Sequence, residues 1–334
     1  MAAMTILRSV LATVIAAPLL AGCAVEAPAP TPATMRFEFH SAFLMNLHHF
    51  LVDAARHPGR IDAVKWDVPP TPDEMAALHQ AVAFYETTFG KRSLLFDDQL
   101  RDIKHALARV DDAQRQAGGL GLPPELAAVL DRVAPIYARC LWTSQDRVNR
   151  DWIAHVQVLE ARYGAQIQPR LQRIFETRFP ASIRDDVVVA TGSINGAYTG
   201  PTPPQTVLPS GWDEYDGLAA LEMIWHEASH TGADEHLIDL IETESHARGR
   251  EAPDNLWHAA LFEAVGVTVS DVLAADGIHY VEYAEAQGVY THGWDAYVPS
   301  LHGPWRAWID GHGTLGAAVD AMLSSLTAPA KPVS

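Results

Sequence analysis

The sequence predicts a mainly α-helical protein with a small β-sheet, an α+β fold. Leucine, alanine and valine recur at three- and four-residue intervals through much of residues 71–178, as on the buried faces of amphipathic helices. After Asp185 the pattern changes to short β-branched segments between turns rich in glycine and proline, which is typical of strands. With 334 residues, of which 48% are apolar, the chain can form one large or two modest domains.

The N-terminal segment has the composition of an export signal. Arg8 is its only charged residue before Cys23, and the apolar run over residues 10–20 is shorter than the roughly 20 residues that span a bilayer. The segment ends in Leu20-Ala21-Gly22-Cys23 and resembles the lipobox of bacterial lipoproteins. The resemblance implies cleavage before Cys23, lipidation of Cys23, and anchoring in the cell envelope at the periplasmic face of the outer membrane. The alternative is an ordinary secretory signal that is cut near the same position.

Behind the signal peptide (residues 1–23) we expect a tether and then a helical region. Alternating prolines predict an extended tether over residues 24–36, and the helical region covers residues 37–182. Its first helix, residues 39–51, contains His40, His48 and His49, and forms either a core helix or the wall of a cleft or second metal site. Further helices are predicted from Thr71 to Gly90 and over 96–112, 123–140 and 144–178, the last with a break near Gly164.

The second region is predicted over residues 183–328. Strands over 186–191 and 205–208 precede a helix that begins just after Asp213 or Asp216. The remaining helices are predicted over 235–248, 255–266, 300–309 and 314–326.

The helix that begins after Asp213 or Asp216 contains the sequence His226-Glu227-Ala228-Ser229-His230. Two histidines four residues apart lie on the same face of a helix, so both imidazoles can reach one metal ion. Neutral imidazole nitrogens suit Zn²⁺, which lowers the pKa of a bound water molecule to about 7. Glu227 projects about 100° further round the helix and can act as a general base beside the metal.

This segment resembles the His-Glu-x-x-His helix of the zincin metallopeptidases, and the two short strands before it resemble the sheet of that family. The resemblance implies a zinc site, Glu227 as the catalytic base, and a peptide substrate that adds to the edge of the sheet. The third ligand has two candidates on the helix over 255–266, His258 and Glu263. Five residues separate them, about 140° round the helix, so one of the two faces the metal.

His258 is the predicted third ligand because it lies among apolar neighbours and needs a partner, and Glu263 is the alternative because it has the ligand type of the gluzincins. His236 occupies the position of the third metzincin ligand, but the glycine of that pattern is displaced by one residue, to Gly232. Tyr283 and Tyr290 are candidates for stabilising an oxyanion.

The excess of acidic residues limits the kinds of partner that the protein can bind. Lysine and arginine number 24 against 41 aspartate and glutamate residues, which argues against nucleic acid. The sequence therefore predicts an exported, membrane-anchored, zinc-dependent hydrolase that acts on peptides or proteins. The alternative is a non-catalytic helical envelope lipoprotein that binds a partner or a metal. A di-iron carboxylate bundle would need a second Glu-x-x-His, which the chain lacks.

Overall fold

The structure is a computed structural model, and it describes residues 34–193 and 196–326. The predicted signal peptide 1–23, the lipidation site Cys23 and most of the tether 24–36 lie outside the described residues. The described residues from Thr34 onward belong to one compact unit. The predicted division into a helical region (37–182) and a second region (183–328) stays a prediction.

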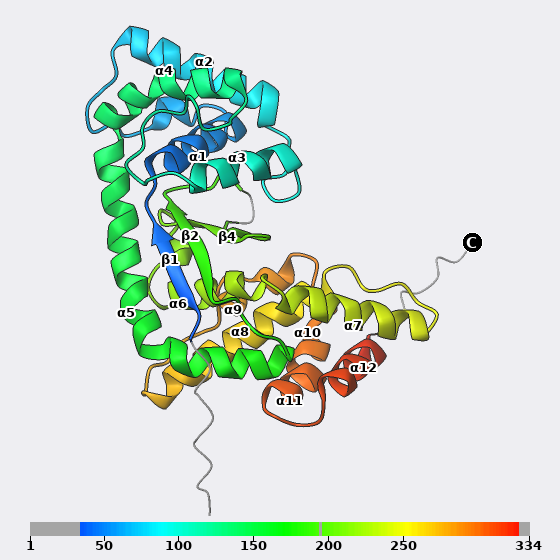
Figure 1. The fold of residues 1–334 in the computed structure, drawn as a ribbon. Coiled ribbons are helices and arrows are strands. Elements are labelled where there is room, and N and C mark those ends of the chain that lie inside the picture. The colour runs from blue at the N-terminus through cyan, green and yellow to red at the C-terminus, as the bar shows by residue number, and fades with distance from the viewer. Residues whose placement is uncertain (1–33, 194–195, 327–334) are drawn as a thin grey trace, which may run out of the picture. The chain divides into compact units, whose positions relative to one another are not determined.

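The predicted fold class is confirmed: helices dominate, and four strands form one mixed sheet (Figure 1). The strands are β1 (Arg36–His40), β2 (Ser182–Val188), β3 (Tyr198–Pro201) and β4 (Pro204–Pro209). The helices before the second strand are α1 (Phe43–Arg56), α2 (Pro72–Phe89), α3 (Asp98–Ala108), α4 (Pro124–Cys140) and α5 (Trp142–Phe175). The later helices are α6 (Leu218–Ser229), α7 (Ala233–Ala247), α8 (Leu256–Ala275), α9 (Tyr283–Ala286), α10 (Val298–Ser300), α11 (Arg306–Ile309) and α12 (Leu315–Ser325).

The strands lie in the order β1-β2-β4-β3. Strands β1, β2 and β4 run parallel, whereas β3 is antiparallel to β4 and forms one edge of the sheet. Strands β2 and β4 correspond to the two predicted strands, but β2 begins at Ser182 and ends at Val188, earlier than expected. Strands β1 and β3 were not predicted. Residues 39 and 40, expected in a helix, end strand β1, and Arg36, expected in the tether, begins it.

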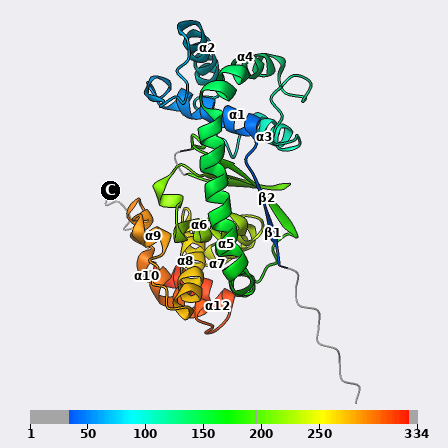
Figure 2. The ribbon, with the colours of Figure 1, turned by 90° about the vertical axis from the view of Figure 1, so that its left-hand side faces the viewer.

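Both faces of the sheet are buried. Along β2, Ile183 and Val187 face a core formed with α5, α6 and α8, whereas Val188 faces a second core formed with α1–α4. The alternation follows from the pleat of a strand, in which neighbouring side chains point to opposite faces. Figures 1 and 2 show α1–α4 on one side of the sheet and α6–α12 on the other, with the long helix α5 running past both.

The start of α2 follows its local signal. The Thr71 hydroxyl accepts a hydrogen bond from the backbone N–H of Glu74, whose carboxylate accepts one from the N–H of Thr71, so α2 begins with a capping box. The predicted break near Gly164 is wrong, because α5 continues through it. A Cβ atom at Gly164 would crowd the side-chain carboxylate of Glu160, one turn earlier in α5, and would lie at an ordinary contact distance of 3.4 Å from Trp225 of α6.

Two apolar helices, α6 and α8, contribute many residues to the core on the side of the sheet that Ile183 and Val187 face. Helix α6 follows Gly217, whose φ of 59° reverses the chain at a conformation that favours glycine. Helix α8 extends beyond its predicted end at residue 266, to Ala275. In the part of the chain that the structure describes, α8 alone has the length and apolar content to cross a bilayer, and 72% of its most apolar window is buried inside the fold.

Candidate metal centre

Helix α6 and the turn after it present two of the predicted ligands. His226 lies in the last turn of α6 and is almost fully buried, and His230 follows the last helical residue. The backbone N–H of His230 donates to the carbonyl oxygen of Glu227, which keeps the chain turning at the end of the helix. The two imidazoles therefore lie on one face, with their ring centroids 5.0 Å apart.

The third imidazole comes from α8, which packs against α6. Nε2 of His226 lies 3.2 Å from Nε2 of His258 and 3.3 Å from Nε2 of His230. One nitrogen from each of the three rings lies within 4.8 Å of the others, a separation at which one ion can touch all three. The structure thus brings together the three residues predicted as ligands, and this buried group could hold a metal ion.

The electrostatics keep two of these rings neutral. Burial, together with the neighbouring His230 and His258, lowers the pKa of His226 well below its usual value. Burial and the proximity of His230 lower the pKa of His258 to about 3. Neutral imidazole is the form that binds a metal, because the ligand nitrogen must carry a free lone pair.

His230 has a different environment. Its Nδ1 atom lies 3.2 Å from a carboxylate oxygen of Asp234, at the start of α7. Burial alone would lower the pKa of His230, but the hydrogen bond to Asp234 and the charge of Glu227 outweigh it and raise the pKa. A carboxylate on Nδ1 turns the Nε2 lone pair toward the other two histidines, which is how metal-binding histidines are commonly oriented.

Glu227, the predicted base, is buried beside the histidines and directed at the sheet. Its Oε2 atom accepts a hydrogen bond of 2.6 Å from the hydroxyl of Thr199 on β3. Burial raises the pKa of Glu227, while His230, the Thr199 hydroxyl and Lys104 hold it down. Its Oε1 atom makes no hydrogen bond with the described residues, so it has capacity to accept a proton.

Glu263, the alternative third ligand, does not join this group. It accepts a hydrogen bond of 3.1 Å from the hydroxyl of Tyr290, and His302 approaches it at 3.5 Å. Because it lies five residues beyond His258 on α8, it faces the segment after that helix. His236, at the metzincin position on α7, is also absent from the group.

Aromatic rings surround the three histidines. Phe262 stacks on His226 with a centroid distance of 3.9 Å, and Trp257 stacks on His258 at 4.9 Å. Trp294 approaches the ring of His258 edge-on, at 5.4 Å. These rings lower the local polarity and restrict water, which strengthens electrostatic interactions within the site.

The histidines of α1 do not form a second centre. Nδ1 of His48 lies 2.9 Å from the hydroxyl of Tyr85, and Nδ1 of His49 lies 2.8 Å from the carbonyl oxygen of Thr191. Both rings are buried in the core between α1–α4 and the sheet, and no metal-binding group other than His226, His230 and His258 occurs among the described residues. The core-helix interpretation is therefore the one that the contacts support.

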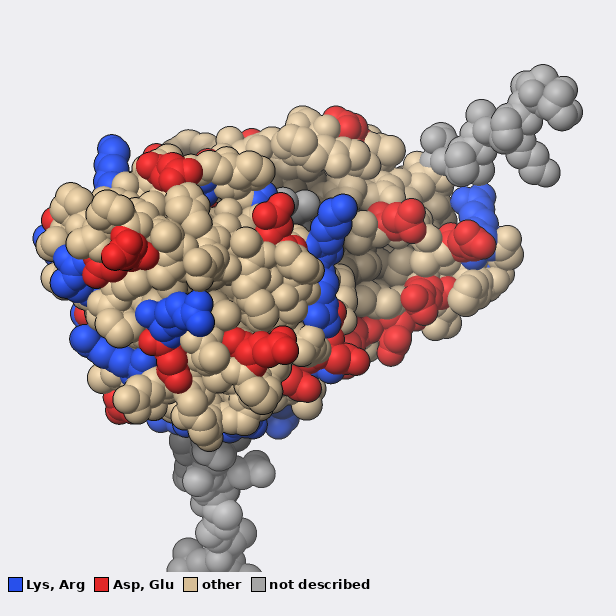
Figure 3. Space-filling model, turned by 90° about the horizontal axis from the view of Figure 1, so that it is seen from above, with Lys and Arg blue, Asp and Glu red and all other residues tan. Residues whose placement is uncertain are grey.

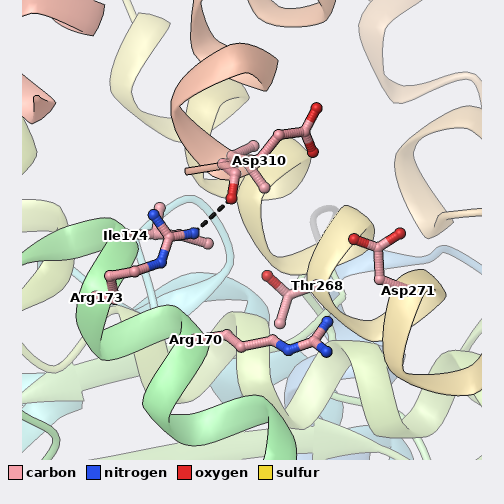
Figure 4. A pocket seen from close by; sticks show the side chains of 7 residues that line it. Arg170, Arg173, Ile174, Thr268, Asp271 and Asp310 are labelled. Carbon is pink, nitrogen blue, oxygen red and sulfur yellow. Dashed lines mark hydrogen bonds between the residues drawn. The ribbon is translucent and has the colours of Figure 1, made fainter. Parts of the chain in front are cut away.

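A separate cavity of about 340 Å³ lies between α5, α8 and α11 (Figure 4). Arg170 and Arg173 of α5 line one side, and Asp271 of α8 and Asp310 line the other. It contains none of the predicted ligands or the predicted base.

Two residues of the site were not predicted from the sequence, Asp234 and Thr199. Asp234 lies four positions after His230, a spacing that could have indicated a partner for that ring. Thr199 had no local signal, since its strand was itself not predicted.

No protein-family model, no curated protein and no solved structure matches this chain.

Proposed function

We propose that this protein is a zinc-dependent hydrolase of the zincin type that cleaves peptide bonds. In this proposal His226, His230 and His258 hold the zinc ion and Glu227 is the general base. The observation that carries the proposal is the convergence of three imidazole nitrogens within 4.8 Å, with Glu227 next to His226 on α6.

The residues fit a zinc ion. Three imidazole nitrogens are a donor set that catalytic zinc uses, and they leave the fourth position of a tetrahedron open. The three Nε2 atoms otherwise face one another in a buried space, where neutral rings satisfy few hydrogen bonds. When bound to such a set, Zn²⁺ acts as a Lewis acid and lowers the pKa of water to about 7.

The protein's own groups supply the remaining functions. Glu227 takes the proton of the attacking water at Oε1, the oxygen that has no other partner among the described residues. Asp234 holds His230 through Nδ1. Tyr283 is the better candidate for an oxyanion donor, because its hydroxyl accepts from Tyr215 and keeps its own proton, whereas the hydroxyl of Tyr290 donates to Glu263.

A peptide substrate is supported by the strand next to the site. Strand β3 has one partner in the sheet, β4, and its Thr199 contacts the predicted base. An extended peptide that added to the free side of β3 would lie beside Glu227, which is the zincin mode of substrate binding.

The proposed cellular location rests on the sequence of the N-terminal segment. Lipidation at Cys23 would hold the enzyme on the bacterial envelope, facing the periplasm. On the face in Figure 3, acidic side chains gather along the right-hand part, where Figure 1 places α7, and this part of the face does not suit nucleic acid.

The first test is the zinc content of a soluble form that begins at Ala24 and so lacks the lipidation site, after reconstitution with zinc. We expect about one zinc per chain, lost in His226→Ala and His258→Ala. The matched control Glu263→Gln, on the same helix as His258, keeps its zinc. Loss of zinc in Glu263→Gln together with retention in His258→Ala would instead assign Glu263 as the ligand.

The second test is peptidase activity in Glu227→Gln, which keeps the size of the side chain and removes its basicity. We expect full zinc content and a loss of roughly 10²–10⁴-fold in kcat, the usual contribution of a general base. No zinc in the reconstituted wild type, or activity that survives Glu227→Gln, would contradict the proposal. Zinc without any peptidase activity would favour the metal-binding lipoprotein.

A further inference from the structure

Thr199 lies where the sheet contacts α6, the helix that contains His226 and Glu227. It is in the edge strand β3, its side chain is buried, and its hydroxyl donates to Oε2 of Glu227 at 2.6 Å. A buried hydrogen bond to a carboxylate is shorter and stronger than one between neutral groups. This is the only hydrogen bond that the Glu227 side chain makes with the described residues.

A second threonine lies behind the first. Thr206 of β4 is directly opposite Thr199 in the register of the two strands, and the two Oγ1 atoms are 2.9 Å apart. A hydroxyl has one proton to donate. If Thr199 gives its proton to the carboxylate of Glu227, Thr206 must donate to Thr199, so the pair forms a chain with one direction.

The chain restrains one oxygen of the carboxylate and leaves the other free. Thr199 is fixed by its β-branched side chain and by the backbone pairing of β3 with β4. Oε2 of Glu227 is thereby held against the sheet, which directs Oε1 away from Thr199. A base that is fixed in this way needs less rearrangement when a proton is transferred to it.

We propose that Thr199 is a positioning residue for Glu227, and that the donor chain from Thr206 through Thr199 to Glu227 sets the orientation of the general base. The inference rests on the proposed function, because it assigns a role to Thr199 in that reaction. It connects substrate binding with catalysis, since the strand that orients the base is also the strand to which a peptide would add.

The test compares Thr199→Val with Thr199→Ser. Valine keeps the shape of threonine and lacks the hydroxyl, whereas serine keeps the hydroxyl. We expect Thr199→Val to lower kcat by roughly 10- to 100-fold with KM and zinc content unchanged, as for a misplaced catalytic group. Thr199→Ser should stay within a few-fold of the wild type, and Thr206→Val should have the smaller effect of the two valine variants.

Thr268→Val is the matched control. Thr268 is also buried, but its hydroxyl donates to the carbonyl oxygen of Ala264 within α8. We expect its kcat to equal that of the wild type. A Thr199→Val enzyme with wild-type kcat, or a loss that Thr199→Ser shares in full, would overturn the inference.

A second readout does not depend on activity. The unfolding temperatures of the metal-free wild type, Thr199→Val, Glu227→Ala and the double variant form a double-mutant cycle. We expect the second substitution to shift the unfolding temperature less when the first is already present, and additive shifts would contradict the contact. A wild type without zinc or peptidase activity would overturn the proposed function, and with it the role of Thr199, even if the cycle showed coupling.

Discussion

Glu222 provides a quantitative test of the buried electrostatics. It lies on α6 and is fully buried; its Oε2 accepts hydrogen bonds from the Tyr280 hydroxyl at 2.8 Å and the Tyr283 backbone N–H at 2.9 Å. Its Oε1 has no partner among the described residues. Burial raises the pKa of Glu222 from 4.5 to about 8, although the two hydrogen bonds oppose the increase. The folded protein therefore holds this proton at pH 7, where the unfolded chain has released it.

The consequence for stability has a definite sign. A pKa that is raised in the folded state contributes stability that is fully present below pH 4.5 and is lost as the pH rises through about 8. At about 1.36 kcal/mol for each pKa unit, the loss over this window is on the order of 5 kcal/mol. Glutamine has the same shape and no proton to lose, so Glu222→Gln removes this dependence.

The assay is urea unfolding of the metal-free protein at several pH values between 5 and 9. We expect Glu222→Gln to match the wild type near pH 5 and to exceed it by several kcal/mol at pH 9. Glu242→Gln, at an exposed position of α7, is the matched control and should follow the wild type throughout. Wild type and Glu222→Gln curves that run parallel over this range would refute the reasoning.

Two further predictions concern the residues that support α6 and α8, the helices of the candidate metal site. Asp234→Ala should weaken zinc binding by roughly 10- to 100-fold in a competition titration, because His230 loses the partner of its Nδ1 atom; Asp239→Ala, exposed on the same helix, should bind zinc like the wild type. Gly266→Ala should lower the free energy of unfolding by about 1–3 kcal/mol, because a Cβ atom there would lie 2.9 Å from Cβ of Glu282. Wild-type stability in Gly266→Ala would show that the segment around Glu282 can move without cost.

The helices were predictable where local chemistry decides their ends. The capping box at Thr71 and the proline after it determine where α2 begins, and both features are visible in the sequence. Gly164 misled the prediction because a glycine inside a helix usually marks an end or a weak point. Here Gly164 is instead a buried position in the middle of α5, next to Trp225 of α6.

The missed strands had weaker signals. In β1, Phe37 and Phe39 alternate with polar residues, a period of two that the short run of five residues displays only briefly. Strand β3 has four residues and includes Gly200 and a proline, both of which are disfavoured in strands. Its pairing with β4 decides its conformation, and a single sequence does not contain that information locally.

Part of the candidate site was also predictable from the sequence, and part was not. Helical spacing was sufficient to place His226 and His230 on one face and to name two candidates on the next helix. Spacing alone did not choose between those candidates; the apolar neighbours of His258 favoured it, and the structure places His258 with the other two histidines. Tyr290 and His302 contact Glu263, and these partners come from a later, irregular segment.

The pairing of β1 with β2 has a consequence for the order in which the chain can fold. Arg36 lies opposite Ser182, so the whole of α1–α5 separates two neighbouring strands. Such a contact closes a very long loop, and its entropy must be lost before the pairing contributes any stability. In a chain that emerges from its N-terminus, β1 is therefore made first among the described strands and must wait for β2. Helix α6 with His226 is made later still, and α8 with His258 after it, so the candidate metal site can form only after residue 258 has been made.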